Sequence, residues 1–117
     1  MKIFDCFMFF DEDLLLDMRM NILNKFVDYF VIVESKYFHN GEKRDLNFNI
    51  YNYPKFKDKI IYIVQEKQPS GLSTVNSSDD EGKKSYKMIL NAHLREHSQR
   101  NLIKNGLTKA NDEDIIL

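Results

Sequence analysis

The chain has 117 residues, of which 43% are hydrophobic, and its charged side chains nearly cancel at a net charge of −1. This length is enough for one globular domain with a single core, and the balanced charge excludes the basic field that drives nonspecific nucleic-acid binding. Cys6 is the only cysteine, so an internal disulfide is excluded. No apolar run is long enough to span a membrane, and the first residues do not have the pattern of a secretory signal peptide. We therefore expect a cytoplasmic protein with neither a membrane span nor a nucleic-acid partner.

Two buried strands with a helix between them are predicted in the first 35 residues. Residues 2–10 form a short run rich in aromatic and apolar side chains, which is typical of a buried strand. Residues 11–13 are acidic, which favours the start of a helix. Apolar residues then recur at three- and four-residue steps and predict an amphipathic helix: Leu15, Met18, Ile22 and Phe26. The unbroken apolar run within residues 27–35 predicts a strand covered on both faces, as in parallel sheets.

The middle of the chain is predicted to contain a third buried strand between two irregular segments. Residues 46–56 are rich in Asn and Tyr, and we interpret them as loop and short helix. Residues 59–65 read Lys-Ile-Ile-Tyr-Ile-Val-Gln, which predicts the strand. Residues 68–84 have low hydrophobicity and turn-forming side chains, so we expect a mobile loop there.

A long helix and the beginning of a fourth strand are predicted in the last third. The helix is expected over residues 83–105, and Gly106 is well placed as the residue that stops it. Residues 114–117 are expected to begin the strand. Strands that alternate with helices indicate an α/β fold with a Rossmann-like, mostly parallel sheet of about four strands and flanking helices.

Glu34 is the strongest candidate for a ligand-binding side chain. It ends the second predicted strand, and ligands of parallel sheets bind just beyond the carboxyl ends of the strands. The carboxylate could accept hydrogen bonds from a ribose or a base, or it could pair with an arginine such as Arg19, and the two roles are compatible. Arg100 could clamp a phosphate with its planar guanidinium, or form an ordinary helical ion pair with Glu96.

Two further patterns resemble metal sites but lack the right surroundings. His93, Glu96 and His97 match the H-x-x-E-H pattern of zinc proteases, although no third ligand follows on another helix. Asp112 and Asp114 form a D-x-D pair that would suit Mg²⁺ or Mn²⁺. These two acids precede their strand, however, and so would lie at the end of the sheet opposite the ligand. We favour a surface helix for the first pattern and a solvated turn for the second.

Several pieces of the chain, taken in order, resemble glycosyltransferase family 17, whose best-known member adds the bisecting GlcNAc to glycoproteins. The pieces are residues 3–10, 12–20, 27–35, 59–63, 95–96, 99–101, 106–107 and 112–117. Together they span nearly the whole chain apart from residues 68–84.

The resemblance implies a GT-A-type fold that binds a nucleotide sugar such as UDP-GlcNAc and transfers the sugar to a glycan acceptor. It also implies a divalent metal, Mn²⁺ or Mg²⁺, held by a D-x-D motif in the complete enzyme. In the family that motif follows the strand that begins here at Asp114. We therefore expect residues 1–117 to be the truncated, amino-terminal, nucleotide-sugar-binding part of such a domain, inactive alone and with its catalytic residues unknown.

The resemblance also implies roles for five side chains. Phe10 and Glu12 would contact the donor nucleotide, Glu34 its base or ribose, and Arg100 its phosphates, while Arg19 would orient Glu12 or Glu34. This interpretation requires that parallel strands bring Glu34 and Arg100 to a common cleft. The alternatives are a non-catalytic nucleotide-binding or interaction module, and a zinc protein built on the two helical histidines.

Overall fold

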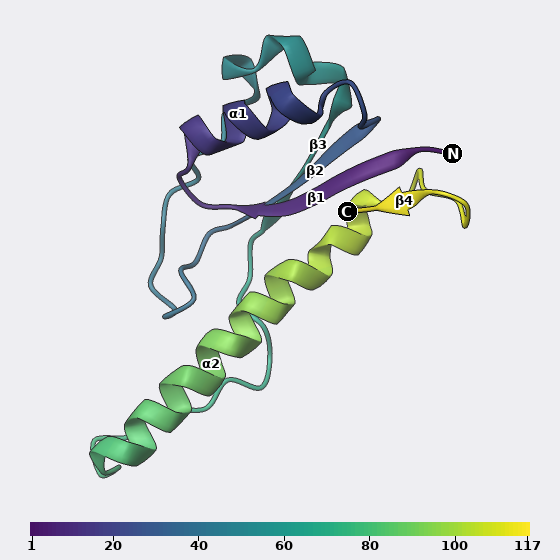
Figure 1. Cartoon of the computed structure of the whole chain (residues 1–117). Helices are drawn as coiled ribbons and strands as arrows, with labels where there is room; N and C mark the ends of the chain where they lie inside the picture. Colours follow the sequence, from purple (N-terminus) through teal and green to yellow (C-terminus); the bar gives the residue numbers. More distant parts are fainter.

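The computed structural model describes residues 1–117, and its centre is a sheet of four parallel strands (Figure 1). The strands are β1 (Ile3–Phe9), β2 (Tyr29–Ser35), β3 (Ile60–Gln65) and β4 (Ile115–Ile116), in the spatial order β3-β2-β1-β4. The helices are α1 (Asp13–Leu23) and α2 (Glu81–Asn101), with three short 3₁₀ turns, η1 (Ile50–Asn52), η2 (Pro54–Lys59) and η3 (Leu102–Gly106). The predicted α/β fold with a Rossmann-like parallel sheet is confirmed.

The strand register brings three carboxyl ends to one edge of the sheet. Phe9 of β1 pairs with Glu34 of β2, and Glu34 pairs with Val64 of β3. β2 is the central strand, and every residue from Phe30 to Ser35 is buried, which confirms the expectation of a strand covered on both faces. The segments that follow β1, β2 and β3 therefore begin next to one another.

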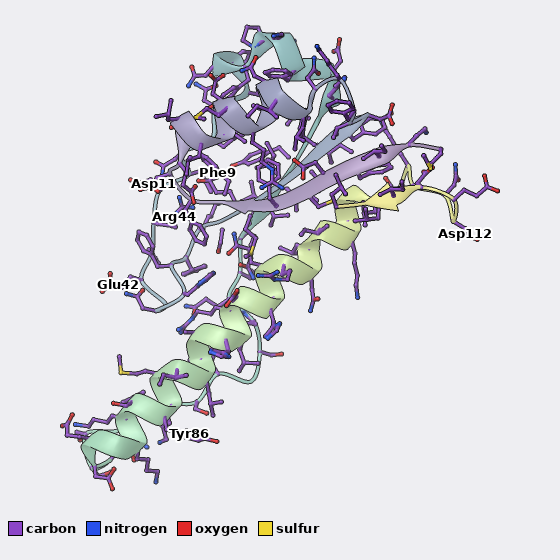
Figure 2. The ribbon with its side chains drawn as sticks, viewed as in Figure 1. Phe9, Asp11, Glu42, Arg44, Tyr86 and Asp112 are labelled. Carbon is purple, nitrogen blue, oxygen red and sulfur yellow. The ribbon has the colours of Figure 1, made fainter.

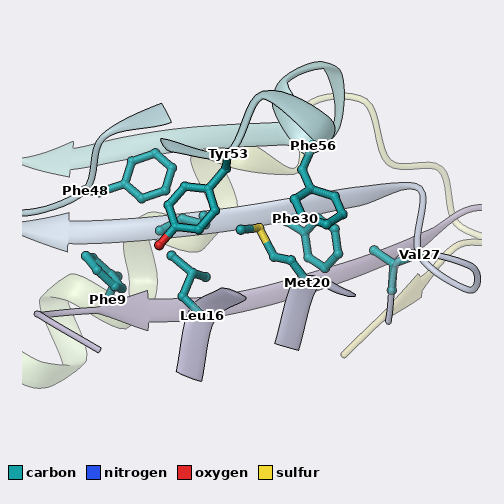
Figure 3. Packing of buried hydrophobic residues seen from close by; sticks show 9 residues of the cluster. Phe9, Leu16, Met20, Val27, Phe30, Phe48, Tyr53 and Phe56 are labelled. Carbon is teal, nitrogen blue, oxygen red and sulfur yellow. The ribbon is translucent and has the colours of Figure 1, made fainter. Parts of the chain in front are cut away.

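A layer made by α1, η1 and η2 covers one face of the sheet (Figure 3). The buried side chains between this layer and the sheet are Phe9, Leu16, Met20, Val27, Phe30, Ile32, Phe48, Tyr53 and Phe56. The rings of Phe48 and Tyr53 are stacked with their centroids 5.8 Å apart, and Phe48 also packs on Tyr62 of β3. Packed aromatic rings therefore cover the carboxyl half of β2 and β3 on this side.

The face that α1 buries differs from the predicted one. Leu16 and Met20 point into the core, whereas Leu15, Ile22 and Phe26 are 63–66% exposed. Both sets follow helical spacing, because apolar residues surround most of this helix, so the pattern alone did not choose between them. The rotation of α1 is fixed by Arg19, which reaches down to Asp5 of β1 through two hydrogen bonds of 2.7 and 2.6 Å.

The helix α2 lies under the other face with its carboxyl-terminal part, while its amino-terminal part projects away from the sheet (Figure 1). Gly106, just beyond α2, packs so closely on β2 that a Cβ atom would lie 2.5 Å from Val31 Cγ1. Its φ angle is not positive, so this glycine provides close packing rather than the left-handed helix stop that we expected.

No helix in the structure is both long enough and apolar enough to cross a membrane.

The tract predicted as a mobile loop is held against α2. Asn91 of α2 bonds both the backbone N–H and the carbonyl of Ser73, each at 2.8 Å. Asp80 caps the helix by accepting a hydrogen bond from the Lys83 N–H at 2.7 Å. Residues 81–84 of the predicted loop are therefore the first turn of α2, which begins at Glu81 rather than Lys83.

Candidate functional site

Glu34 is completely buried, and each of its carboxylate oxygens is hydrogen bonded. The N–H groups of Asn47 and Phe48 donate to Oε2 and Oε1 at 2.7 and 3.1 Å, and the Tyr62 hydroxyl donates to Oε1 at 2.7 Å. Burial, together with the hydrogen bond to Glu34, raises the pKa of Tyr62, which keeps the phenol protonated as a donor. A buried carboxylate is costly unless it is paired, and these donors offset much of that cost.

Arg44 completes the surroundings of Glu34. Its Nη2 atom lies 3.0 Å from Glu34 Oε2, and its side chain is only 3% exposed. The same guanidinium donates to the carbonyl oxygen of Ser35 at 2.6 Å and to that of Phe10. Asn47 Nδ2 also donates to the Phe10 carbonyl, at 2.9 Å. The Glu34–Arg44 pair therefore ties together the segments that follow β1 and β2.

A cleft of about 920 Å³ opens directly above this buried pair, beyond the carboxyl ends of β1, β2 and β3. The residues that line it come from the segments after all three strands: Phe10, Asp11, Lys36, Tyr37, Phe38, Lys43, Arg44, Asp45, Asn47 and Glu66. Figure 2 shows Asp11 and Arg44 at this end of the sheet and Asp112 at the other. The cleft has the position that ligand sites occupy in parallel α/β sheets.

The cleft offers groups of three chemical kinds. Lys36 and Lys43 provide ammonium groups, of which Lys36 forms a loose, exposed ion pair of 3.6 Å with Glu66. Phe38 is 44% exposed, and its ring lies 5.7 Å from the Arg44 guanidinium carbon. Asp11 and Asp45 supply carboxylates on the lining. Three cationic and three anionic side chains therefore line the cleft, together with the aromatic rings of Phe10, Tyr37 and Phe38.

Phe10 lines the cleft, whereas Glu12 does not. Phe10 is on the lining, and its ring meets the His39 ring edge-on with the centroids 5.2 Å apart. Glu12 lies in the turn between β1 and α1. Its Oε2 atom accepts the N–H groups of Phe10 and Asp11, both at 3.0 Å, so it shapes the turn after β1.

Arg19 forms no hydrogen bond with Glu34 or Glu12, although it lines a small pocket together with Glu12, so the structure does not show the orienting role expected of it. Its guanidinium pairs in a bidentate manner with Asp5, which is 1% exposed. The hydrogen bond to Asp5 raises the pKa of Arg19. The arginine that reaches Glu34 comes instead from the turn after β2.

Arg100 does not share a cleft with Glu34, so the requirement stated above is not met and the nucleotide site expected of these two side chains together does not form. It forms an exposed ion pair of 3.0 Å with Glu96, one helical turn earlier on α2. The helix packs on the face of β2 that presents Val31 and Val33, because Gln99 binds the Val33 carbonyl and Gly106 contacts Val31. The Glu34 side chain points to the opposite face, since side chains alternate along a strand.

The two patterns that resemble metal sites do not form one. Asp114 accepts hydrogen bonds from the backbone N–H groups of Lys2 and Asn111, both at 2.8 Å, and these bonds lower its pKa. Asp114 therefore stabilises the turn that precedes β4, at the end of the sheet where β1 begins. No group of three or more His, Cys, Asp or Glu side chains is placed to hold a metal ion, so His93 and His97 gain no third ligand.

The side chains that sequence reasoning missed lie in the turn after β2. Lys36, Phe38, Lys43 and Arg44 line the cleft, yet only Glu34 was selected from this region. A usable signal was present, because a turn that directly follows a central parallel strand must begin at the ligand edge. Two adjacent basic residues after the Asn40-Gly41 turn were therefore candidates.

A parallel sheet in the order 3-2-1-4, with a polar cleft beyond its carboxyl ends, defines a Rossmann-like ligand-binding domain. The sequence model of glycosyltransferase family 17 matches residues 1–116. The chain belongs to glycosyltransferase family 17, which confirms the resemblance drawn from the ordered sequence pieces. Comparison with curated proteins and with solved structures finds no match.

Proposed function

We propose that this glycosyltransferase domain binds the nucleotide part of a sugar-nucleotide donor in the cleft beyond β1, β2 and β3, with UDP-GlcNAc as the expected donor and a glycan as the acceptor. The observation that carries the proposal is that segments after three parallel strands form one cleft containing two lysines and an exposed aromatic ring. Family membership supports a sugar donor, and the nucleotide part of that donor is our proposal. The cleft replaces the site expected of Glu34 and Arg100, which lie on opposite faces of the sheet.

The lining residues suggest how the donor is held. Lys36 and Lys43 would bind the diphosphate, because ammonium groups attract phosphate oxygens as point charges. Phe38 would stack on the base, since an exposed ring offers a flat apolar surface. Asp11 and Asp45 would accept hydrogen bonds from the ribose hydroxyls. The same two lysines would offset the negative charge that develops on the diphosphate as the sugar leaves.

Glu34 and Arg44 have a different role in this proposal. Both oxygens of Glu34 are occupied, and Arg44 already donates to two backbone carbonyls. We therefore propose that this pair holds the cleft walls in place rather than contacting the donor, which revises the nucleotide contact expected of Glu34.

The divalent metal is expected only in the complete enzyme, from a D-x-D motif that follows β4. Within residues 1–117 no group of three or more His, Cys, Asp or Glu side chains is placed to hold a metal ion, and Asp112 lies at the opposite end of the sheet from the cleft (Figure 2). The proposed binding of the nucleotide accordingly relies on the lysines and the aromatic ring alone, and no step of the reaction is assigned to a metal.

Calorimetric titration of the purified chain with UDP and UDP-GlcNAc tests the proposal. We expect saturable binding that the double substitution Lys36→Ala/Lys43→Ala weakens about tenfold or more, a loss of roughly 1.4 kcal/mol. The matched control is Lys57→Ala, which removes an exposed lysine from η2, near the start of β3 and away from the cleft. Binding that is absent at millimolar nucleotide, or that the double substitution leaves unchanged, would refute the proposal.

A further inference from the structure

The turn after β2 forms a hairpin that makes up one wall of the cleft; we call residues 36–44 the cleft hairpin. Tyr37 and Lys43 pair in an antiparallel bridge, and the Phe38 N–H donates to the Glu42 carbonyl at 2.8 Å. Gly41 closes the tip with φ +93°, a conformation that favours glycine. One side of this hairpin lines the cleft, and the other side rests on α2.

Arg95 of α2 supports the tip of the cleft hairpin. Its Nη1 atom donates to the His39 carbonyl at 3.0 Å. Gly41 lies directly on the guanidinium, so closely that a Cβ atom would be 2.5 Å from Arg95 Nη2. Arg95 is itself braced, because its Nε atom donates to Gln68 Oε1 at 2.9 Å.

Gln99, one turn further along α2, supports the same hairpin through the His39 side chain. Gln99 is completely buried, and its Nε2 atom donates to the Val33 carbonyl at 3.2 Å. Its Oε1 atom is thereby left to accept from His39 Nε2, also at 3.2 Å. A histidine that carries a proton on Nε2 can donate here whether it is neutral or charged.

His39 connects this support to the opposite wall of the cleft. Its ring packs edge-on against Phe10, which lines the cleft after β1. Arg44, at the base of the hairpin, binds the Phe10 carbonyl from the other side. Contacts therefore run without interruption from α2 through His39 to both walls of the cleft.

We propose that Arg95 and Gln99 are positioning residues that hold the cleft hairpin on α2 and so set the affinity of the cleft for the nucleotide, without touching the nucleotide themselves. This inference rests on the proposed function of the cleft. Because Arg95 and Gln99 belong to α2, a shift of this helix would also move the cleft hairpin. The amino-terminal part of α2 projects from the body of the molecule (Figure 1).

Two measurements on the purified chain test this inference together: amide hydrogen exchange of residues 36–44, and the UDP dissociation constant. Arg95→Ala should raise exchange at Phe38 and Gly41 about tenfold, as expected when local opening becomes easier. It should weaken UDP binding about fivefold, the low end of typical coupling between sites. Arg95→Lys, which can still donate to the His39 carbonyl, should restore part of both effects.

A second substitution and a control complete the design. Gln99→Leu keeps a similar side-chain size but cannot bind His39, and should reproduce the effects of Arg95→Ala. Arg100→Ala removes a neighbouring arginine of α2 that does not reach the hairpin, and should change neither measurement.

The outcomes separate this inference from the proposed function. Unchanged hairpin exchange in both Arg95→Ala and Gln99→Leu would overturn the inference whatever the nucleotide does. Faster exchange with unaltered UDP affinity would overturn the positioning role while leaving the nucleotide site intact. Failure of the unaltered chain to bind UDP would instead reject the proposed function, and with it the link from the hairpin to the nucleotide.

Discussion

Arg44 Nη2 lies 3.0 Å from Glu34 Oε2, and both side chains are almost fully buried at the ligand edge of the sheet. Removing one partner of such a pair leaves an uncompensated charge, so we expect Arg44→Ala to lower the free energy of unfolding by about 3–5 kcal/mol. The measurement is urea denaturation followed by circular dichroism.

The double substitution Arg44→Met/Glu34→Gln serves as the comparison, because it removes both charges and keeps much of the volume. It should be more stable than Arg44→Ala alone. Equal stability of Arg44→Ala and the unaltered chain would show that the pair does not hold the cleft walls together.

Tyr62 makes the stability of the fold depend on alkaline pH. Burial and the hydrogen bond to Glu34 raise its pKa above the ordinary value of 10.0. A group with a raised pKa stabilises the folded chain fully below its unfolded pKa and loses this contribution as the pH rises towards the folded value. Tyr53, beside Asp13, acts in the same direction.

As the pH rises from about 9 to about 11, a range around the ordinary tyrosine pKa, the free energy of unfolding should therefore fall less for Tyr62→Phe than for the unaltered chain. At neutral pH it should be less stable by about 1 kcal/mol, because Glu34 loses one hydrogen-bond donor. Urea midpoints at several pH values measure both effects, and Tyr51→Phe, at an 81% exposed position, is the control. Parallel pH profiles of Tyr62→Phe and the unaltered chain would contradict the account.

Gly106 is required for the contact between the segment after α2 and the sheet. Gly106→Ala would place a Cβ atom 2.5 Å from Val31 Cγ1, so we expect a loss of about 1–3 kcal/mol through overpacking. Gly82→Ala is the matched control, because a Cβ atom there meets nothing closer than 3.5 Å and the site is helical. Because Gly82 lies in the first turn of α2, that control should gain no more than about 0.5 kcal/mol. Similar melting temperatures for the two variants would argue against the close packing of Gly106.

Cys6 should be an unreactive thiol. Burial, and next the charge of Asp5, raise its pKa to about 11. The thiolate is the reactive form, so alkylation by iodoacetamide at neutral pH should be at least about tenfold slower than for a cysteine in a peptide. Mass spectrometry of samples quenched at successive times measures the alkylation rate. Alkylation at the peptide rate would mean that the strand β1 opens readily.

The fold was largely predictable from the sequence, for a physical reason that β2 illustrates. A strand buried on both faces must be apolar without alternation, and the run Tyr29–Val33 carries that signature within a single segment. The burial of α1 was not predictable in the same way. Leu15 and Leu16 each begin an apolar series at helical spacing, and only the distant contact between Arg19 and Asp5 selects the second.

The candidate site was predictable only in part. Glu34 was identified because its place at a strand end follows from local sequence, but its partner was misjudged. Arg44 approaches Glu34 because the cleft hairpin folds back, a feature that depends on Gly41 and on contacts with α2. Arg100 was selected from its resemblance to a family motif, whereas its neighbours Arg95 and Gln99 are the residues of that helix that reach the hairpin.

The most direct test of the account is a nitrogen–proton NMR titration of the chain with UDP, first with a chelator and then with Mg²⁺. We expect the largest amide shift changes at Phe10, Asp11, Glu66 and the cleft hairpin, with little dependence on Mg²⁺. Changes centred on Asp112 and Asp114 would place the nucleotide at the opposite end of the sheet. Changes that appear only with Mg²⁺ would show that the lysines and the aromatic ring do not suffice for binding, and either result would contradict the account.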